Sequence, residues 1–331
     1  MKFSKAKNAS IIFSCFILFL IVALTLYPQT YMQSILNGLD IWLTSVVPAL
    51  FPFFFLTKLL TKLGFIEKLS KIFAPFTQKL FKCPGVSGYV FFMSIISGYP
   101  VGSKLVGELY ENGKISKTDA IKMNSFCSTS GPLFVIGTIG VGMLLSQTAG
   151  IIILISHIFG AILNGFLFRN YKKNDIDLKN NIEKTNLHKS DDILKSTMED
   201  SIISIFMVGG YIVVFYMIID VLFNFHILSS FSNLFFNFLN FFNLPKSFFD
   251  GVFSGIVEVT RGAYNLSSCN VSKDILCVAI CGLVSFGGIS IHLQSLTFLS
   301  KCKIKMSVYL LQKITHSIFS MLICALIMLI L

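Results

Sequence analysis

The chain alternates long apolar runs with short polar segments. An apolar run of roughly 20 residues is the length that crosses a bilayer as one helix. Runs of this kind predict seven membrane-spanning helices, at 11–27, 43–60, 116–145, 148–168, 201–222, 272–299 and 306–331. The pattern therefore predicts an all-α polytopic membrane protein with several spans.

Two segments have a different, amphipathic pattern. Lysines alternate with Ile, Leu and Phe at helical spacing over 65–82, and Phe and Asn dominate 227–244. Helices with one apolar and one polar face lie in the plane of the membrane interface. We expect two interfacial helices here, with an ordinary cytoplasmic loop as the alternative for 65–82.

Two shorter apolar segments predict re-entrant hairpins. Residues 86–112 are apolar for only about a dozen positions before a Gly-Tyr-Pro turn, and residues 248–257 end in a similar way at Glu258. So few residues cannot cross a bilayer as one helix, but they suit two half-helices joined by a turn. The runs at 116–145 and 272–299 are interrupted as well. The predicted helix-break residues are Gly98, Pro100, Gly131, Pro132, Gly287 and Gly288.

The two halves of the chain repeat one order of features. Pro84 precedes the first hairpin and Pro245 the second, and Ser116 and Ser272 begin the broken helices that follow. An odd number of spans separates the hairpins, so the repeats are inverted, as in secondary transporters. This predicts an N-terminal span with an outer connection over 1–42, a first repeat over 43–168, a cytoplasmic linker over 169–198 and a second repeat over 199–331.

Composition and charge agree with a membrane protein. The chain is 54% hydrophobic and 13% charged, whereas soluble domains are about 25% charged. Of its 27 Lys and Arg, 22 fall in segments that are cytoplasmic if the N-terminus is inside. Cytoplasmic loops are enriched in these residues, so the net charge of +11 reports topology and requires no nucleic acid. The C-terminus is then expected outside.

The sequence offers little support for an enzyme. It contains no CxxC pair, phosphate-binding loop or nucleophile triad, and its eight cysteines lie mostly in apolar runs. Small packing residues explain such cysteines. We expect no enzyme activity, no cofactor and no metal site.

The helix breaks predict where a substrate binds. The N-termini of half-helices present free N–H groups and a partial positive charge, which favour an anion. A midplane site between the breaks would therefore suit a small anionic substrate, with hydroxyl, amide and imidazole groups to orient it. The candidate substrate-binding residues are Lys104, Ser128, Thr129, Ser130, Glu258, Thr260, Arg261, Ser290, His292 and Gln294.

Charged residues inside the membrane are costly and usually functional. Arg261 has a planar fork that suits a carboxylate. The alternative is that Lys104 pairs with Glu108, and Arg261 with Glu258, so that each pair only locks its own hairpin. Lys313 is expected to extend to the cytoplasmic interface and to be structural. His157, in the span at 148–168, is expected to be a hydrogen-bonded packing residue.

Four motifs resemble those of a known family. They are Gly98–Lys104, Cys127–Phe134, Glu258–Gly262 and Phe286–Gln294. In this order they resemble the sporulation integral membrane proteins of the YlbJ type, in the wider nucleoside-recognition or gate-domain group. The resemblance implies two gate repeats and an architecture similar to concentrative nucleoside transporters. It further implies export of dipicolinic acid from the mother cell across the outer forespore membrane during sporulation.

Two other functions stay open at this point. One is transport of a nucleoside or nucleobase, which would use amide contacts such as those of Asn124 and Gln294. The other is a non-transporting sporulation membrane scaffold. The expected partners are a small anionic substrate and the lipid bilayer, while the coupling ion (H⁺ or Na⁺) and the oligomeric state are left open.

Overall fold

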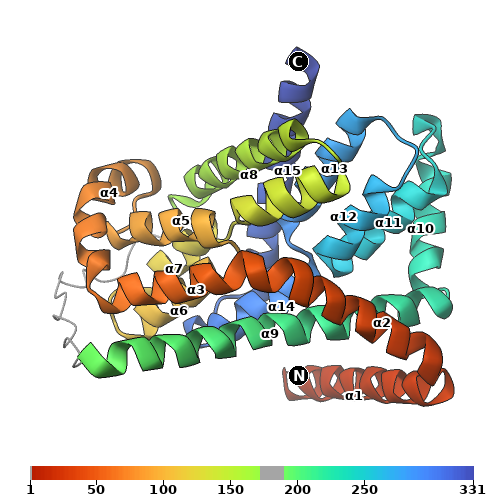
Figure 1. Ribbon diagram of the computed structural model, residues 1–331, viewed down its shortest axis with the longest axis horizontal. Coiled ribbons are helices and arrows are strands. Elements are labelled where there is room, and N and C mark those ends of the chain that lie inside the picture. Colours follow the sequence, from red (N-terminus) through yellow and green to blue (C-terminus); the bar gives the residue numbers. More distant parts are fainter. Residues whose placement is uncertain (1, 172–189) are drawn as a thin grey trace.

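The N-terminal part of the chain forms two helices joined by a sharp bend. The computed structural model describes residues 2–171 and 190–331, and every regular element in these residues is helical (Figure 1). Helix α1 (Lys2–Leu26) and helix α2 (Pro28–Ile41) form a pair that is bent by 107° at the break between them. Pro28 occupies the first turn of α2, where its missing N–H costs nothing.

Helix α2 runs on past residue 42, where the first predicted segment ends. It continues through a π-helical turn η1 (Trp42–Val46) into α3 (Val47–Lys62). One face of α2 is buried in the protein. Ser34 and Gly38 are buried, and a Cβ added to Gly38 would lie 3.1 Å from the Cα of Val213 in α9. The face of α2 that packs on α9 therefore carries small and polar residues.

The first repeat has the predicted hairpin and broken helix. Helix α4 (Phe65–Phe81) is followed by the half-helices α5 (Val86–Ser97) and α6 (Val101–Glu111). Next come α7 (Lys117–Asn124), the π-helix η2 (Leu133–Met143) and α8 (Gln147–Phe168). Ser116 and Asp119 form a capping box at the start of α7. The break between α7 and η2 is wider than predicted, because it begins at Ser125.

The second repeat follows the same order of elements. Its long first helix α9 (Ser190–Asn224) begins inside the predicted 169–198 linker, of which 172–189 lies outside the described residues. The remaining elements are α10 (Ile227–Phe238), η3 (Asn240–Phe242), α11 (Lys246–Val257), α12 (Val259–Ser267), α13 (Lys273–Phe286), α14 (Gly288–Phe298), η4 (Ser300–Cys302) and α15 (Met306–Ile330). A single residue, Glu258, separates the two hairpin helices, and Gly287 separates α13 from α14.

The long helices hold the two repeats together. Helix α9 packs along α2 and α3, and in Figure 1 it passes beneath the hairpin α5–α6 and α14 and continues toward α11–α12. Helix α15 packs against both α8 and α13, so the last helix of the second repeat lies on the last helix of the first. The hairpins and breaks are thereby enclosed between helices of both halves.

The number of full-length spans is lower than the seven that the sequence predicted. Within the described residues, four helices are long and apolar enough to cross a membrane, or up to six if each bent pair counts as one span. The predicted span over 116–145 is not one helix, because its unwound middle divides it into α7 and the short η2. The multi-span all-α fold is confirmed, with broken elements in place of some continuous ones.

Candidate substrate site

In each repeat the hairpin touches the broken helix. Gly98 ends α5 with φ +78°, and a Cβ there would lie 2.6 Å from the backbone nitrogen of Gly131 in the first break. In the second repeat, a Cβ on Gly288 would lie 3.0 Å from the carbonyl oxygen of Gly255 in α11. Only glycine allows backbones to approach so closely, and the predicted break residues are thus contact points between hairpin and helix.

A cavity lies where these contact points converge. It has a volume of about 60 Å³ and is lined by both repeats, which is smaller than the roughly 300–1,000 Å³ that is usual for small-molecule sites. Apolar side chains of α9, Val208 and Ile212, form part of its wall. The hydroxyl of Tyr99 crosses between the repeats and donates to the carbonyl oxygen of Val284, 3.3 Å away.

Six of the predicted residues line this cavity, and several others have partners elsewhere. The six are Gly98, Ser130, Gly131, Glu258, Thr260 and Gln294. Thr129 donates to Ser94 (Oγ1–Oγ 3.0 Å), and Nδ1 of His292 lies 3.2 Å from the hydroxyl of Tyr309. Ser290 accepts a hydrogen bond from Gln294 at 3.3 Å and so supports the amide that reaches the cavity.

Glu258 already occupies the helix N-terminus that was expected to hold an anion. Its Oε1 accepts from the backbone N–H of Thr260 at 3.1 Å, and its Oε2 accepts from that of Arg261 at 2.8 Å. The side chain therefore caps α12, and the residue is only 2% exposed. The second hairpin brings its own carboxylate to the cavity.

Arg261 faces away from this carboxylate and contacts α9. Its Nη2 forms an ion pair with Asp220, its Nη1 donates to the carbonyl of Tyr216 at 3.3 Å, and its guanidinium lies 5.2 Å from the Tyr216 ring centroid. Asp220 also accepts from Ser34 of α2. The alternative in which Arg261 pairs with Glu258 was wrong about the partner, which comes from another helix. We call Ser34, Tyr216, Asp220 and Arg261 the second charge cluster.

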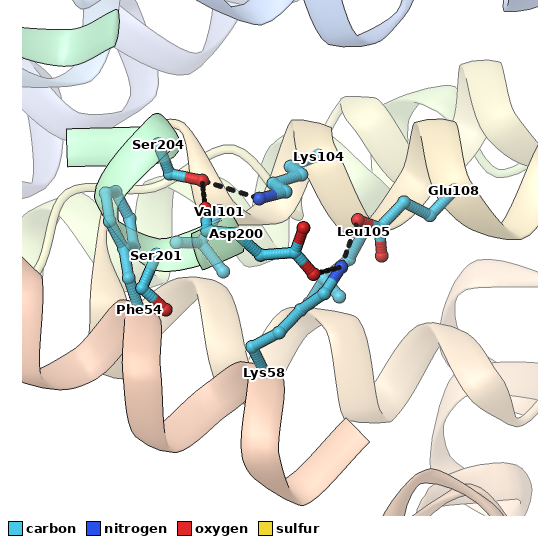
Figure 2. A pocket seen from close by; sticks show the side chains of 9 residues that line it. All are labelled: Phe54, Lys58, Val101, Lys104, Leu105, Glu108, Asp200, Ser201 and Ser204. Carbon is cyan, nitrogen blue, oxygen red and sulfur yellow. Dashed lines mark hydrogen bonds and ion pairs between the residues drawn. The ribbon is translucent and has the colours of Figure 1, made fainter. Parts of the chain in front are cut away.

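Lys104 also binds α9, near the other end of that helix. Figure 2 shows its ammonium donating to Ser204, at 2.6 Å. Glu108 does not pair with it but with Lys58 of α3, at 2.8 Å. Asp200 forms ion pairs with both Lys58 and Lys62, at 3.6 and 3.4 Å. We call Lys58, Lys62, Lys104, Glu108, Asp200 and Ser204 the first charge cluster.

The structure does not bring Lys104 and Arg261 together. Their partners Ser204 and Asp220 are 16 residues apart in α9, which at 1.5 Å per residue is about 24 Å. One small ligand cannot contact both cations in this arrangement. Each of them instead fastens its own hairpin to the same long helix.

Lys313 is buried. The prediction that its side chain extends to the cytoplasmic interface was wrong. The residue is 2% exposed, and its ammonium donates to the carbonyl and the hydroxyl of Ser128, at 3.2 and 2.6 Å. It also lies 4.7 Å from the Tyr99 ring centroid. The helical spacing of Tyr309, Lys313 and His316 was the signal that could have indicated a polar face turned inward.

His157 is confirmed as a hydrogen-bonded packing residue. Its Nε2 accepts from the backbone N–H of Ser130 at 2.8 Å, and its Nδ1 lies 2.8 Å from the hydroxyl of Ser285. The ring thus satisfies one unwound backbone group of the first break and contacts the end of α13. Unwound backbone is tolerated at membrane depth only where such partners exist.

Known proteins resemble this chain first in fold and then in sequence. The chain shares its fold with a variant of CNTnw, a concentrative nucleoside transporter, solved in an outward-facing state. The TM-score is 0.58 at 14% identity, over 94% of this chain and 86% of the other. The protein is therefore an integral membrane protein with a transporter-like fold. Residues 43–146 match the Gate family, described as nucleoside recognition.

A curated relative covers nearly the whole chain. The sporulation integral membrane protein YlbJ of Bacillus subtilis (strain 168) is 28% identical over 95% of this chain and 82% of its own length. The resemblance inferred from the four motifs is thereby confirmed, as is the similarity in fold to concentrative nucleoside transporters.

Proposed function

We propose that this protein transports a small anionic metabolite, and that dipicolinate is its substrate. In this proposal it moves dipicolinate from the mother cell toward the forespore, across the outer forespore membrane. The observation that supports transport is the cavity lined by both repeats at their hairpin turns and breaks. The name of the B. subtilis relative supports the setting in sporulation.

In the mechanism we propose, each hairpin closes the cavity toward one side of the membrane. The turn at Gly98 and the turn at Glu258 contribute to its lining from different repeats. Each hairpin is fastened to α9 by its own charge cluster. Releasing one cluster while the other holds would open the cavity to one side at a time, which is what alternating access requires. The predicted division into two gate repeats and a linker is part of this proposal.

Nucleoside transport is the second candidate, because two cavity residues favour it. The carboxylate of Glu258 and the amide of Gln294 both reach the cavity. A carboxylate accepts hydrogen bonds from hydroxyl groups but repels an anion, whereas an amide can bind the edge of a base. The description of the Gate family also points toward nucleosides.

Flux in proteoliposomes distinguishes the candidates. Purified protein would be tested with dipicolinate and with uridine, each under a proton gradient and under a sodium gradient. We expect saturable dipicolinate flux. Uridine flux without dipicolinate flux would mean that the substrate is a nucleoside and not dipicolinate. No flux of either compound from folded protein would favour the scaffold alternative.

Glu258→Gln sharpens this test. Removing the negative charge should leave dipicolinate flux intact or raise it, whereas it should abolish flux of a nucleoside held through its hydroxyls. The lost cap should cost about 1 kcal/mol of stability, which thermal unfolding would detect. Glu111→Gln is the matched control, because Glu111 pairs only with Lys301, whose side chain is 70% exposed. Loss of dipicolinate flux in Glu258→Gln alone would contradict the expectation for an anion.

A further inference from the structure

Helix α15 presents a buried polar face to the helix breaks. Tyr309, Lys313, His316 and Ser320 recur at helical spacing and are all 2% exposed or less, whereas Leu311, Ile318 and Leu322 on the other side are exposed. His316 contacts the carbonyl of His157 at 3.0 Å. In a helix apolar enough to span a membrane, polar residues on one face usually serve a function.

Lys313 is the charged residue of this face, and its charge is not balanced by a neighbour. Among residues 2–171 and 190–331, the ion pairs join Lys58, Lys62, Arg261 and Lys301 to carboxylates, and none involves Lys313. Within the described part of the chain, its ammonium contacts the oxygens of Ser128 and the face of the Tyr99 ring. An interior cation without a counter-charge is expensive.

The ring of Tyr99 connects the Lys313 ammonium to the cavity, because it contacts both. Tyr99 lies under the Lys313 ammonium and also lines the cavity. Ser128 and Ser130 belong to the same unwound segment, and Ser130 is a lining residue. A small movement of Tyr99 would let the ammonium reach a ligand there.

We propose that Lys313 supplies the positive charge that selects a carboxylate ligand in the cavity. This inference rests on the proposed function. It replaces Lys104 and Arg261 as the predicted anion-binding cations, because both of them bind α9. The ligand's carboxylate lies toward Lys313, and its remaining polar groups lie toward Gln294. The substrate class is a small organic carboxylate, and a neutral nucleoside gains nothing from Lys313.

Ligand-induced thermal stabilisation of the purified full-length protein tests this, with pyridine-2,6-dicarboxylate, pyridine-2-carboxylate, pyridine and uridine as probes. We expect the order dicarboxylate, monocarboxylate, pyridine in wild type. Lys313→Gln should weaken dicarboxylate binding by about tenfold or more, since a charge-assisted hydrogen bond is lost. Lys313→Arg should retain part of it, and Lys301→Gln, at an exposed site, should match wild type.

Each outcome decides a separate question. If Lys313→Gln binds the dicarboxylate as wild type does, the role of Lys313 is wrong while anion transport stands. If wild type binds uridine but no carboxylate, both this inference and the anionic substrate are wrong. Should Lys313→Gln fail to fold, Ser128→Ala replaces it. Removing the hydroxyl that competes for the ammonium should tighten dicarboxylate binding several-fold, and weaker binding would overturn the role of Lys313.

Discussion

The two hairpins have the same place in their repeats but are fastened differently. The first is held by several lysines, two carboxylates and a serine, with side chains of Lys58 and Asp200 that are 18% and 41% exposed. The second is held by one ion pair between Arg261 and Asp220, at 21% and 22% exposure, with added contacts from Arg261 to Tyr216. A hydrated network exchanges partners easily, whereas a single pair with fixed geometry does not.

The N-termini of the helices that follow the two turns also differ, in how they are capped. Helix α12 is capped by the carboxylate of Glu258, whereas α6 begins at Pro100 with no side-chain cap. Close backbone packing occurs in both hairpins, because Gly102 lies against the carbonyl of Cys127 and a Cβ on Gly262 would lie 2.1 Å from the Cα of Gly255. We therefore expect close packing to hold both hairpins, with the Glu258 cap and the Arg261–Asp220 pair adding electrostatic stabilisation to the second.

Gly102→Ala should have the largest effect and would test the packing of the first hairpin. A Cβ at this position would lie 1.6 Å from the carbonyl oxygen of Cys127, so the backbone must move. We expect a loss of about 3 kcal/mol or more, or no folded protein at all. Thermal unfolding and monodispersity in detergent would measure it. Gly210→Ala is the control, since its Cβ meets no atom within 4 Å, and equal behaviour of the two variants would refute the packing argument.

Arg261→Gln should have the next largest effect and would test the second hairpin. It leaves Asp220 partly buried and charged without its partner, at a cost of about 2–3 kcal/mol. A double-mutant cycle with Asp220→Asn would isolate the pair, and the double variant should be more stable than Arg261→Gln alone. Additive losses in the cycle would mean that the ion pair does not hold the hairpin.

Glu108→Gln should have the smallest effect and would test the first charge cluster. The Lys58–Glu108 pair is partly exposed, so we expect a loss of about 1 kcal/mol or less that shrinks as salt is added. Unfolding at low and high salt would check this. A loss as large as that of Arg261→Gln would remove the contrast between the hairpins.

Local signals in the sequence were enough to predict the hairpins, the breaks and the capping box. Gly98, Gly131 and Gly287 mark their breaks because the backbone there needs glycine, and Ser116 and Asp119 form their cap within one turn. The continuation of α2 into η1 and α3 was not predicted, because the buried face of α2 packs on α9, which is distant in the sequence.

Long-range partners could not be predicted in this way. Arg261 pairs across 41 positions, Lys104 across 100 and Lys313 across 185. Each cation has an acid or a serine close by in the sequence. Spacing along the chain does not show that, in the folded protein, the cation pairs with a different and distant residue. A cavity does lie between the breaks, where the sequence predicted a substrate site, but the predicted cations Lys104 and Arg261 do not line it.

The spacing of two carboxylates on α9 defines a length along this helix. Asp200 and Asp220 are 20 residues apart on this helix, which is about 30 Å and matches the thickness of the hydrocarbon core of a bilayer. The apolar stretch between them thus fits a membrane of ordinary thickness with a carboxylate at each surface. In a thicker membrane one of the two carboxylates would be drawn into the lipid, and the hairpin it holds would be strained. We therefore expect the acyl-chain length of the surrounding lipid to change how firmly each hairpin is held.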